Sequence, residues 1–88
     1  MKILIVEDDI VIRTIEKAVL SELTPFIYEA SNFEKAMEII NRQSIDLIVL
    51  DINLNGSKSG LELLEQIRKQ NKNVYVIIIS DTGKIKES

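Results

Sequence analysis

Short apolar runs alternate with amphipathic segments along the whole chain. Four runs have the near-continuous hydrophobic character of buried parallel strands. They are Lys2–Val6, Phe26–Ala30, Asp46–Asp51 and Val74–Ile79. Between the runs, apolar residues recur at intervals of three and four, as in a helix with one side against a core. The pattern therefore predicts the order βαβαβαβ.

The first predicted helix follows the acidic turn Glu7–Asp9 and is ended by Pro25, since the residue before proline disfavours helix. An acid in such a turn can cap a helix, and Asp9 is assigned this role. The apolar positions at helical spacing are Val11, Ile12, Ile15, Ala18, Val19 and Leu23. The charged residues that fall mainly on the other side are Arg13, Glu16, Lys17 and Glu22.

The second and third helices carry capping signals. Ser31 and Glu34 have the spacing of a capping box, and Ser59 and Glu62 repeat it. The apolar stripes are Phe33, Ala36, Met37 and Ile40 in the second helix, and Leu61, Leu64 and Ile67 in the third. Alternating strands and helices favour right-handed crossovers, so we expect a parallel sheet with helices on both faces.

Composition narrows the range of partners and chemistries. The 88 residues fit one domain, 1–88, and the net charge of −3 does not suggest a nucleic acid or an anionic membrane as partner. The chain has no cysteine and no histidine, which excludes disulfides and thiolate metal sites and removes the commonest general base. The apolar runs are too short to span a membrane, and the first residues do not resemble a signal peptide. A cytoplasmic location is therefore expected.

Carboxylates stand at the ends of two of the predicted strands. Glu7 and Asp8 follow the first strand, and Asp51 is the last residue of the third. Parallel strands deliver their carboxyl ends to one edge of the sheet, where open α/β folds bind ligands. Two carboxylates about 4 Å apart repel by roughly 4 kcal/mol at an effective dielectric of 20, so such a site keeps a proton or recruits a cation.

Oxygen ligands without histidine or cysteine favour Mg²⁺ or another hard cation, which commonly bridges carboxylates to phosphate oxygens. A carboxylate can also act as a nucleophile and form an acyl phosphate. Each group alone has an ordinary structural explanation: Glu7–Asp9 as a capping turn, Asp51 as a loop residue, and Ser80 as the turn residue after the fourth strand. Acids on two adjacent buried strands together favour a functional site.

Four segments of the chain, in order and at matching spacing, resemble the receiver domains of two-component response regulators. They are Ile3–Asp9 with Arg13 after it, Asp46–Leu54, Gly60–Leu64 with Ile67 and Arg68, and Val76–Ser80. The resemblance runs over essentially the whole chain. It implies a flavodoxin-like sheet with the strand order 2-1-3-4-5 and helices on both faces.

The resemblance also implies roles for individual residues. Asp51 would accept a phosphoryl group from a phosphohistidine on a sensor histidine kinase or phosphotransfer protein. Asp8 and Asp51 would bind Mg²⁺ together with the backbone carbonyl of Asn53, and Glu7 would act through a metal-bound water. Ser80 would be the switch hydroxyl that moves toward the phosphoryl group.

The chain also departs from the family pattern. It stops before the family's fifth strand, so we expect that strand, the last helix and a phosphoryl-binding lysine to be missing. Lys58 or Lys84 could replace the lysine, although a loop lysine is usually solvated. Asp81 stands where the family usually has a small residue and could repel an incoming phosphoryl group. Without a fifth strand, Val74–Ile79 becomes an exposed edge, which templates pairing with another chain. We therefore expect self-association through this strand or the first helix.

Three functions are consistent with these features. The first is a phosphoacceptor receiver domain that uses Asp51 and Mg²⁺. The second is a phosphorylation-independent pseudo-receiver that acts as a protein-binding or dimerisation module, which the missing lysine and Asp81 favour. The third is a Mg²⁺-dependent phosphohydrolase, for which the chain is short and lacks a histidine acid or base. The first is the leading hypothesis and describes a signalling domain that is not an enzyme.

Overall fold

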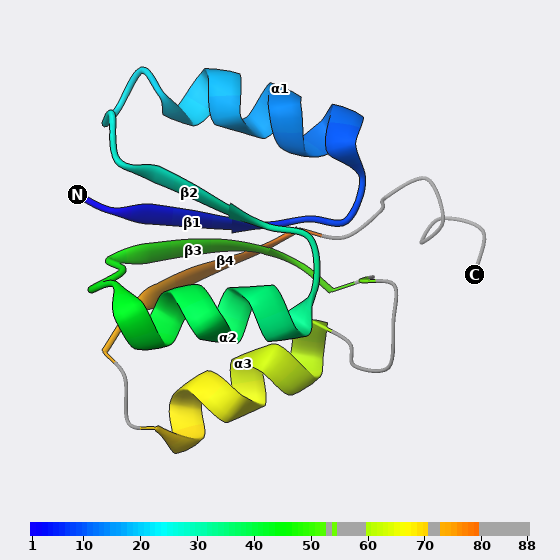
Figure 1. The fold of residues 1–88 in the computed structure, drawn as a ribbon, viewed down its shortest axis with the longest axis vertical. Coiled ribbons are helices and arrows are strands. Elements are labelled where there is room, and N and C mark those ends of the chain that lie inside the picture. Colours follow the sequence, from blue (N-terminus) through cyan, green and yellow to red (C-terminus); the bar gives the residue numbers. More distant parts are fainter. Residues whose placement is uncertain (53, 55–59, 71–72, 80–88) are drawn as a thin grey trace.

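Three helices and four strands alternate along the chain, in the predicted order βαβαβαβ (Figure 1). The computed structural model describes residues 1–52, 54, 60–70 and 73–79. The strands are β1 (Ile3–Val6), β2 (Ile27–Ala30), β3 (Leu47–Asp51) and β4 (Tyr75–Ile79). The helices are α1 (Ile10–Leu20), α2 (Phe33–Arg42) and α3 (Gly60–Lys69). Each strand begins within a residue of its predicted start.

The strands form one parallel sheet with the order β2-β1-β3-β4. This order confirms the flavodoxin-like arrangement for the strands that are described. α1 lies on one face of the sheet, and α2 and α3 lie together on the other (Figure 1). The central strand β1 is completely buried, because it has a neighbour on both sides and helices over both faces.

Side-chain caps determine where the first two helices begin. Asp9 caps α1 as predicted: one of its carboxylate oxygens accepts hydrogen bonds from the backbone nitrogens of Val11 and Ile12, at 2.8 and 3.3 Å. α2 is capped by Asn32 and not by Ser31, because the Asn32 side chain accepts the bond from the Lys35 nitrogen at 2.8 Å. Asparagine is as good an N-cap as serine, so α2 begins one residue later than the capping box predicted.

The main core lies between the sheet and the pair α2 and α3. Its buried members are Leu4, Val6, Ala30, Ala36, Ile40, Ile48, Leu50, Leu54, Leu63, Ile67 and Val74. The predicted stripe of α2 is confirmed, since Ala36 and Ile40 are buried and Phe33 and Met37 pack against the core. The predicted stripe of α3 is wrong at Leu61, which is 57% exposed. The buried positions of α3 are Gly60, Leu63 and Ile67, because the helix turns its glycine toward the sheet.

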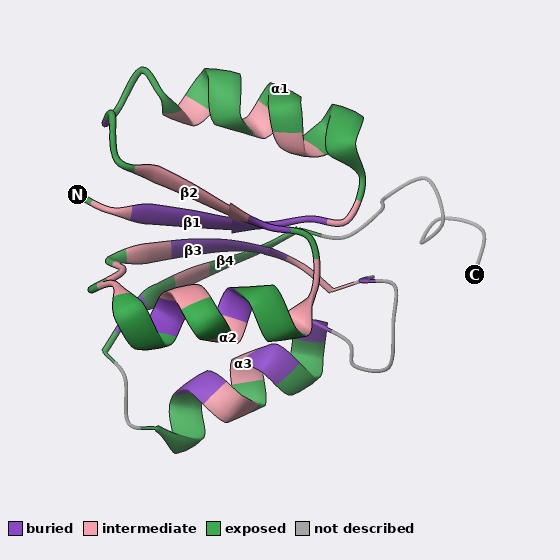
Figure 2. Ribbon diagram, in the orientation of Figure 1, coloured by how far each residue is buried: buried purple, intermediate pink, exposed green. Residues whose placement is uncertain are grey.

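The α1 side of the sheet is covered less completely. α1 contacts β1 and β2, yet no residue of α1 is buried (Figure 2). The helix ends at Leu20, so the predicted apolar position Leu23 falls in the turn that follows. An amphipathic surface helix normally turns its apolar stripe to the core, so the exposure of α1 is unusual.

In the part of the chain that the structure describes, no helix is long and apolar enough to cross a membrane.

Candidate functional site

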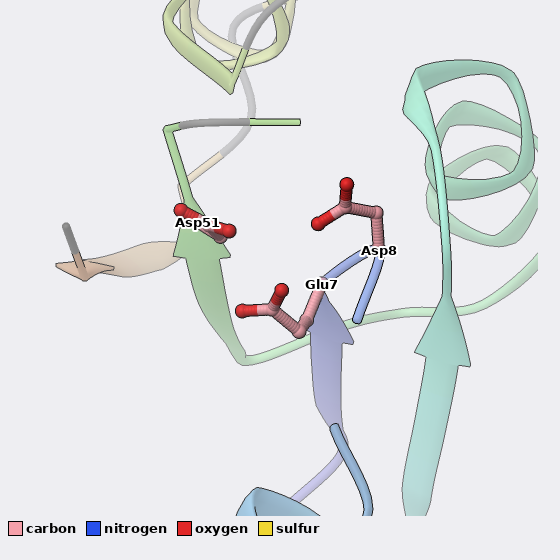
Figure 3. Close-up of side chains that lie close together, drawn as sticks. All are labelled: Glu7, Asp8 and Asp51. Atoms are coloured by element: carbon pink, nitrogen blue, oxygen red, sulfur yellow. The ribbon is translucent and has the colours of Figure 1, made fainter. Parts of the chain in front are cut away.

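Three carboxylates gather at the carboxyl ends of β1 and β3. The register pairs Val6 with Leu50, so the residues that follow, Glu7 and Asp51, end neighbouring strands at the same level. One oxygen from each of Glu7, Asp8 and Asp51 lies within 4.8 Å of the others (Figure 3). The structure therefore brings together the three acids that the strand pattern predicted would meet.

Three hydrogen bonds hold Glu7 in place, two at its backbone and one at its side chain. Its nitrogen donates to the Ala30 carbonyl of β2 at 3.0 Å, and its carbonyl accepts from the Arg13 guanidinium at 2.6 Å. The side chain accepts from the Asp9 nitrogen at 3.1 Å. Arg13 also contacts Glu29 at 3.2 Å, so it joins the end of β1 to α1 and β2. In the sequence, Arg13 was noted only as part of the first segment that resembles receiver domains. Its contacts with Glu7 and Glu29 were not predicted.

Asp51 is positioned by the chain that follows it. The Ile52 nitrogen donates to the Ile79 carbonyl of β4 at 3.3 Å, and the Gly60 nitrogen donates to the Ile52 carbonyl at 3.3 Å. A Cβ atom on Gly60 would collide with the Asp51 carbonyl oxygen and lie 2.6 Å from the Ile52 Cα. Only glycine lets α3 start this close to the strand end. Sequence reasoning treated Gly60 as part of a motif and missed this packing role.

Glu7 is the most buried of the three carboxylates. Glu7 is 3% exposed, whereas Asp8 and Asp51 are half-buried. Burial raises the pKa of Glu7 from 4.5 to about 7, although the bond from the Asp9 backbone acts in the opposite direction. The negative charge of Asp51 and hydrogen bonding with Asp8 and Asp51 raise this pKa further. The raised pKa of Glu7 means that its negative charge is unfavourable at this edge of the sheet unless a cation balances it.

The donor set fits a hard divalent cation. All three side chains offer oxygen, the ligand that Mg²⁺ prefers, and their separation allows one ion to contact more than one of them. Mg²⁺ keeps several of its waters in proteins, so a half-exposed site with a few carboxylates suits it better than a closed cage. Glu7, Asp8 and Asp51 are therefore the residues that could hold Mg²⁺.

Several predicted site positions lie outside the described residues. They are Asn53, with its predicted carbonyl ligand, the switch hydroxyl of Ser80, and the residues Asp81, Lys58 and Lys84. The roles predicted for them stay predictions, as does the assignment of Asp51 as phosphoacceptor.

The residues of this site are ordered along the chain as in a known protein family. A family model described as the response regulator receiver domain matches residues 3–88. The chain belongs to this family. The resemblance inferred from the four sequence segments is confirmed, and the domain is that of a signalling protein of two-component systems.

Individual relatives agree with the family assignment. The chain is 42% identical over 87 residues to the transcriptional regulatory protein MalR of Bacillus subtilis (strain 168), covering 97% of this chain and 37% of MalR. The chain thus spans little more than a third of that relative. The solved receiver domain of NtrX from Brucella abortus is 36% identical, with a TM-score of 0.86, over 97% of this chain and 72% of that one.

A second solved structure bears on the acidic site. The response regulator TrrA from Thermotoga maritima, solved in complex with Mg²⁺-BeF, is 38% identical to this chain, with a TM-score of 0.83. The match covers 91% of this chain and 70% of TrrA. Receiver domains with this fold therefore include one that binds Mg²⁺.

Proposed function

We propose that this receiver domain accepts a phosphoryl group on Asp51 from a phosphohistidine of a sensor histidine kinase or phosphotransfer protein, with Mg²⁺ bound at the acidic cluster. The observation that carries the proposal is the convergence of Glu7, Asp8 and Asp51 within 4.8 Å at one edge of the sheet. Membership of the receiver family supports the same partner class.

The transfer exchanges one bond to phosphorus for another. A carboxylate oxygen of Asp51 forms the new bond to phosphorus, and the phosphorus–nitrogen bond of the phosphohistidine breaks. The bonding electrons leave with the imidazole, which keeps a proton on its other nitrogen. The product is an acyl phosphate on Asp51. A histidine in the receiver is not required, because the donor supplies the leaving group.

Glu7 and Asp8 would assist the attack by the Asp51 carboxylate, because they would help to hold the cation beside it. Asp8 and Asp51 would hold Mg²⁺, and Glu7 would act through a metal-bound water. When bound, the ion would supply positive charge to offset the repulsion between the carboxylates and the phosphoryl oxygens. Mg²⁺ in the TrrA complex supports this choice of metal. The carbonyl of Asn53 as a further ligand and Ser80 as the switch hydroxyl belong to the same proposal.

Phosphorylation of the 88-residue chain tests the proposal. Incubation with Mg²⁺ and a small phosphodonor is expected to add the mass of one phosphoryl group, which peptide mapping places on Asp51. Asp51→Asn abolishes the adduct, and a chelator prevents it. Asp46→Asn is the matched control, because this exposed acid stands at the opposite end of β3 and retains the adduct. Absence of an adduct, or an adduct elsewhere, would contradict the proposal.

The alternative of a phosphorylation-independent module is less well supported, because the acids needed for phosphoryl chemistry are assembled. Self-association through β4 or α1 remains part of the proposed function, as does the cytoplasmic location.

A further inference from the structure

Arg13 connects the acidic site to a neighbouring strand through its guanidinium group. The Nη1 atom donates to the Glu7 carbonyl at 2.6 Å, and the Nε atom donates to Oε1 of Glu29 on β2 at 3.2 Å. The Arg13 side chain is 14% exposed, so both contacts are largely shielded from water. Hydrogen bonds from a charged donor are among the strong ones, and a shielded site strengthens them further.

The Glu7 carbonyl belongs to the peptide bond between Glu7 and Asp8, two of the three acids of the site. Successive side chains of a strand point to opposite faces, yet the Glu7 and Asp8 carboxylates both approach Asp51 (Figure 3). The chain bends at Asp8, which allows this approach. Because a peptide bond is planar, the direction of the Glu7 carbonyl restricts the backbone torsions on either side of it, ψ of Glu7 and φ of Asp8. Arg13 therefore holds the peptide at which the chain bends.

Glu29 holds the guanidinium of Arg13 in turn. Its two carboxylate oxygens contact different cations, Oε1 the Arg13 Nε at 3.2 Å and Oε2 the Lys17 Nζ at 3.0 Å. The hydrogen bond from Lys17, together with the contacts of Arg13, lowers the pKa of Glu29, so this carboxylate is ionised at neutral pH. Glu29 pairs with Ile5 in the register of β2 and β1, two residues before Glu7. The sheet itself thus fixes the residue that anchors Arg13.

We propose that Arg13 is a positioning residue for the cation site: it orients the peptide between Glu7 and Asp8 and thereby sets the affinity of the acidic cluster for Mg²⁺. Arg13 acts through the backbone and not by contact with the ion, because a guanidinium repels a cation. Groups that orient metal ligands commonly contribute roughly 10- to 100-fold to metal affinity. The inference rests on the proposed function, since it takes Glu7, Asp8 and Asp51 as the residues that hold Mg²⁺.

The positive charge of Arg13 makes the direction of the effect diagnostic. If Arg13 acted only through its charge, its removal would tighten Mg²⁺ binding, because like charges repel. If Arg13 positions the acids, its removal weakens binding although the charge has become more favourable. Lys17 is the matched control, because it carries the same charge and contacts the same Glu29 carboxylate. Of the two residues, Arg13 is the one that also donates to the Glu7 carbonyl.

Titration of the 88-residue chain with Mg²⁺, followed by backbone amide signals, tests the inference. Arg13→Met keeps the length of the side chain and removes its donors, so it should weaken Mg²⁺ binding about tenfold. Arg13→Lys keeps the charge but not the planar fork that reaches both Glu7 and Glu29, so a smaller loss is expected. Lys17→Met should not weaken binding. In the metal-free chain, Arg13→Met should also shift the Glu7 carbonyl and Asp8 amide signals, whereas Lys17→Met should leave them in place.

Urea denaturation shows whether each variant is folded under the titration conditions. Wild type that binds no Mg²⁺ would overturn both this inference and the proposed function. Wild type that binds Mg²⁺, with equal or tighter binding by Arg13→Met, would overturn this inference alone. An equal loss in Lys17→Met would also overturn it, because the contact with Glu7 would then not be the cause. If Arg13→Met does not fold, Arg13→Lys decides, and an affinity equal to that of wild type would overturn the inference.

Discussion

The helices on the two faces of the sheet have similar sequence patterns but bury their apolar residues to different extents. On one face, α2 and α3 bury Ala36, Ile40, Leu63 and Ile67 against the strands. On the other face, α1 has apolar residues at the same spacing and buries none of them (Figure 2). Periodicity thus identifies a helix, but the neighbours available to that helix decide which of its sides is covered.

The difference also separates two ways of attaching a helix to a sheet. α2 and α3 are attached by apolar burial. α1 contributes no buried residue of its own, and its side-chain contacts with the sheet are polar: the bond from Arg13 to the Glu7 carbonyl, and the contacts of Arg13 and Lys17 with Glu29. Burial of apolar area is the stronger stabilising term, so the two faces are expected to contribute unequally to stability.

The largest predicted effect contrasts one apolar residue from each face. Leu63→Ala removes a completely buried side chain and should lower the free energy of unfolding by about 2–5 kcal/mol. Val19→Ala, at a position 65% exposed, should lower it by less than about 0.5 kcal/mol in the monomer. Urea denaturation at a low protein concentration measures both. Similar losses at the two positions would contradict the difference between the faces.

The sequence was sufficient for the order of elements and for most of the α2–α3 face. Strand runs, the Asp9 cap and the stripe of α2 follow from local rules that act within a few residues. The exposure of Ile15 and Val19 did not follow from the pattern, because it depends on where α1 stands over the sheet. Leu61 was assigned wrongly for a related reason, since the close approach of Gly60 to Asp51 rotates α3.

The candidate site was predictable to the extent that it depends on topology. Adjacent parallel strands ending in Glu7 and Asp51 must bring these acids to one edge, and the structure does so. The support from Arg13 and Gly60 was not predictable, since it depends on distances between segments far apart in the sequence. The resemblance to receiver domains supplied roles that the positions of the acids alone could not assign.

The second prediction concerns Glu7, which lies at the carboxyl edge of the sheet. Its pKa is raised from 4.5 to about 7, so between these pH values the metal-free folded chain keeps a proton that the unfolded chain has lost. The free energy of unfolding should therefore fall as pH rises through this window, by up to about 3 kcal/mol. Denaturation in a chelator at several pH values measures the slope. Glu7→Gln should flatten it, and an unchanged slope in this variant would assign the effect to another group.

The third prediction concerns the close approach of Gly60, at the start of α3, to the end of β3. Replacing glycine by alanine inside a helix normally stabilises it by up to about 1 kcal/mol. Gly60→Ala should instead destabilise the chain by about 1–3 kcal/mol, because the new methyl group meets the backbone of Asp51 and Ile52. Thermal unfolding measures the sign. Leu61→Ala, at the exposed neighbouring position, serves as the control and should change stability little; a stabilising Gly60→Ala would show that the approach is not tight.

The fourth prediction concerns the side-chain cap at the start of α1. Asp9→Ala removes the cap from two backbone nitrogens and should cost about 1 kcal/mol. Asp9→Asn keeps an acceptor oxygen and should remain close to wild type. Urea denaturation of the two variants compares them directly. Equal losses would mean that the charge of Asp9, and not its hydrogen bonds, stabilises this end of α1.

We propose that Glu7, Asp8 and Asp51 form one cation site at the carboxyl edge of the sheet. The direct test is a titration with Mg²⁺, followed by the backbone amide signals of the isotope-labelled chain. We expect saturable shifts at residues 7, 8 and 51 that are lost in Asp8→Asn and Asp51→Asn, while amides of α1 and α2 far from the edge stay unchanged. Saturation that leaves residues 7, 8 and 51 unperturbed, or that survives both substitutions, would show that these acids do not form the site.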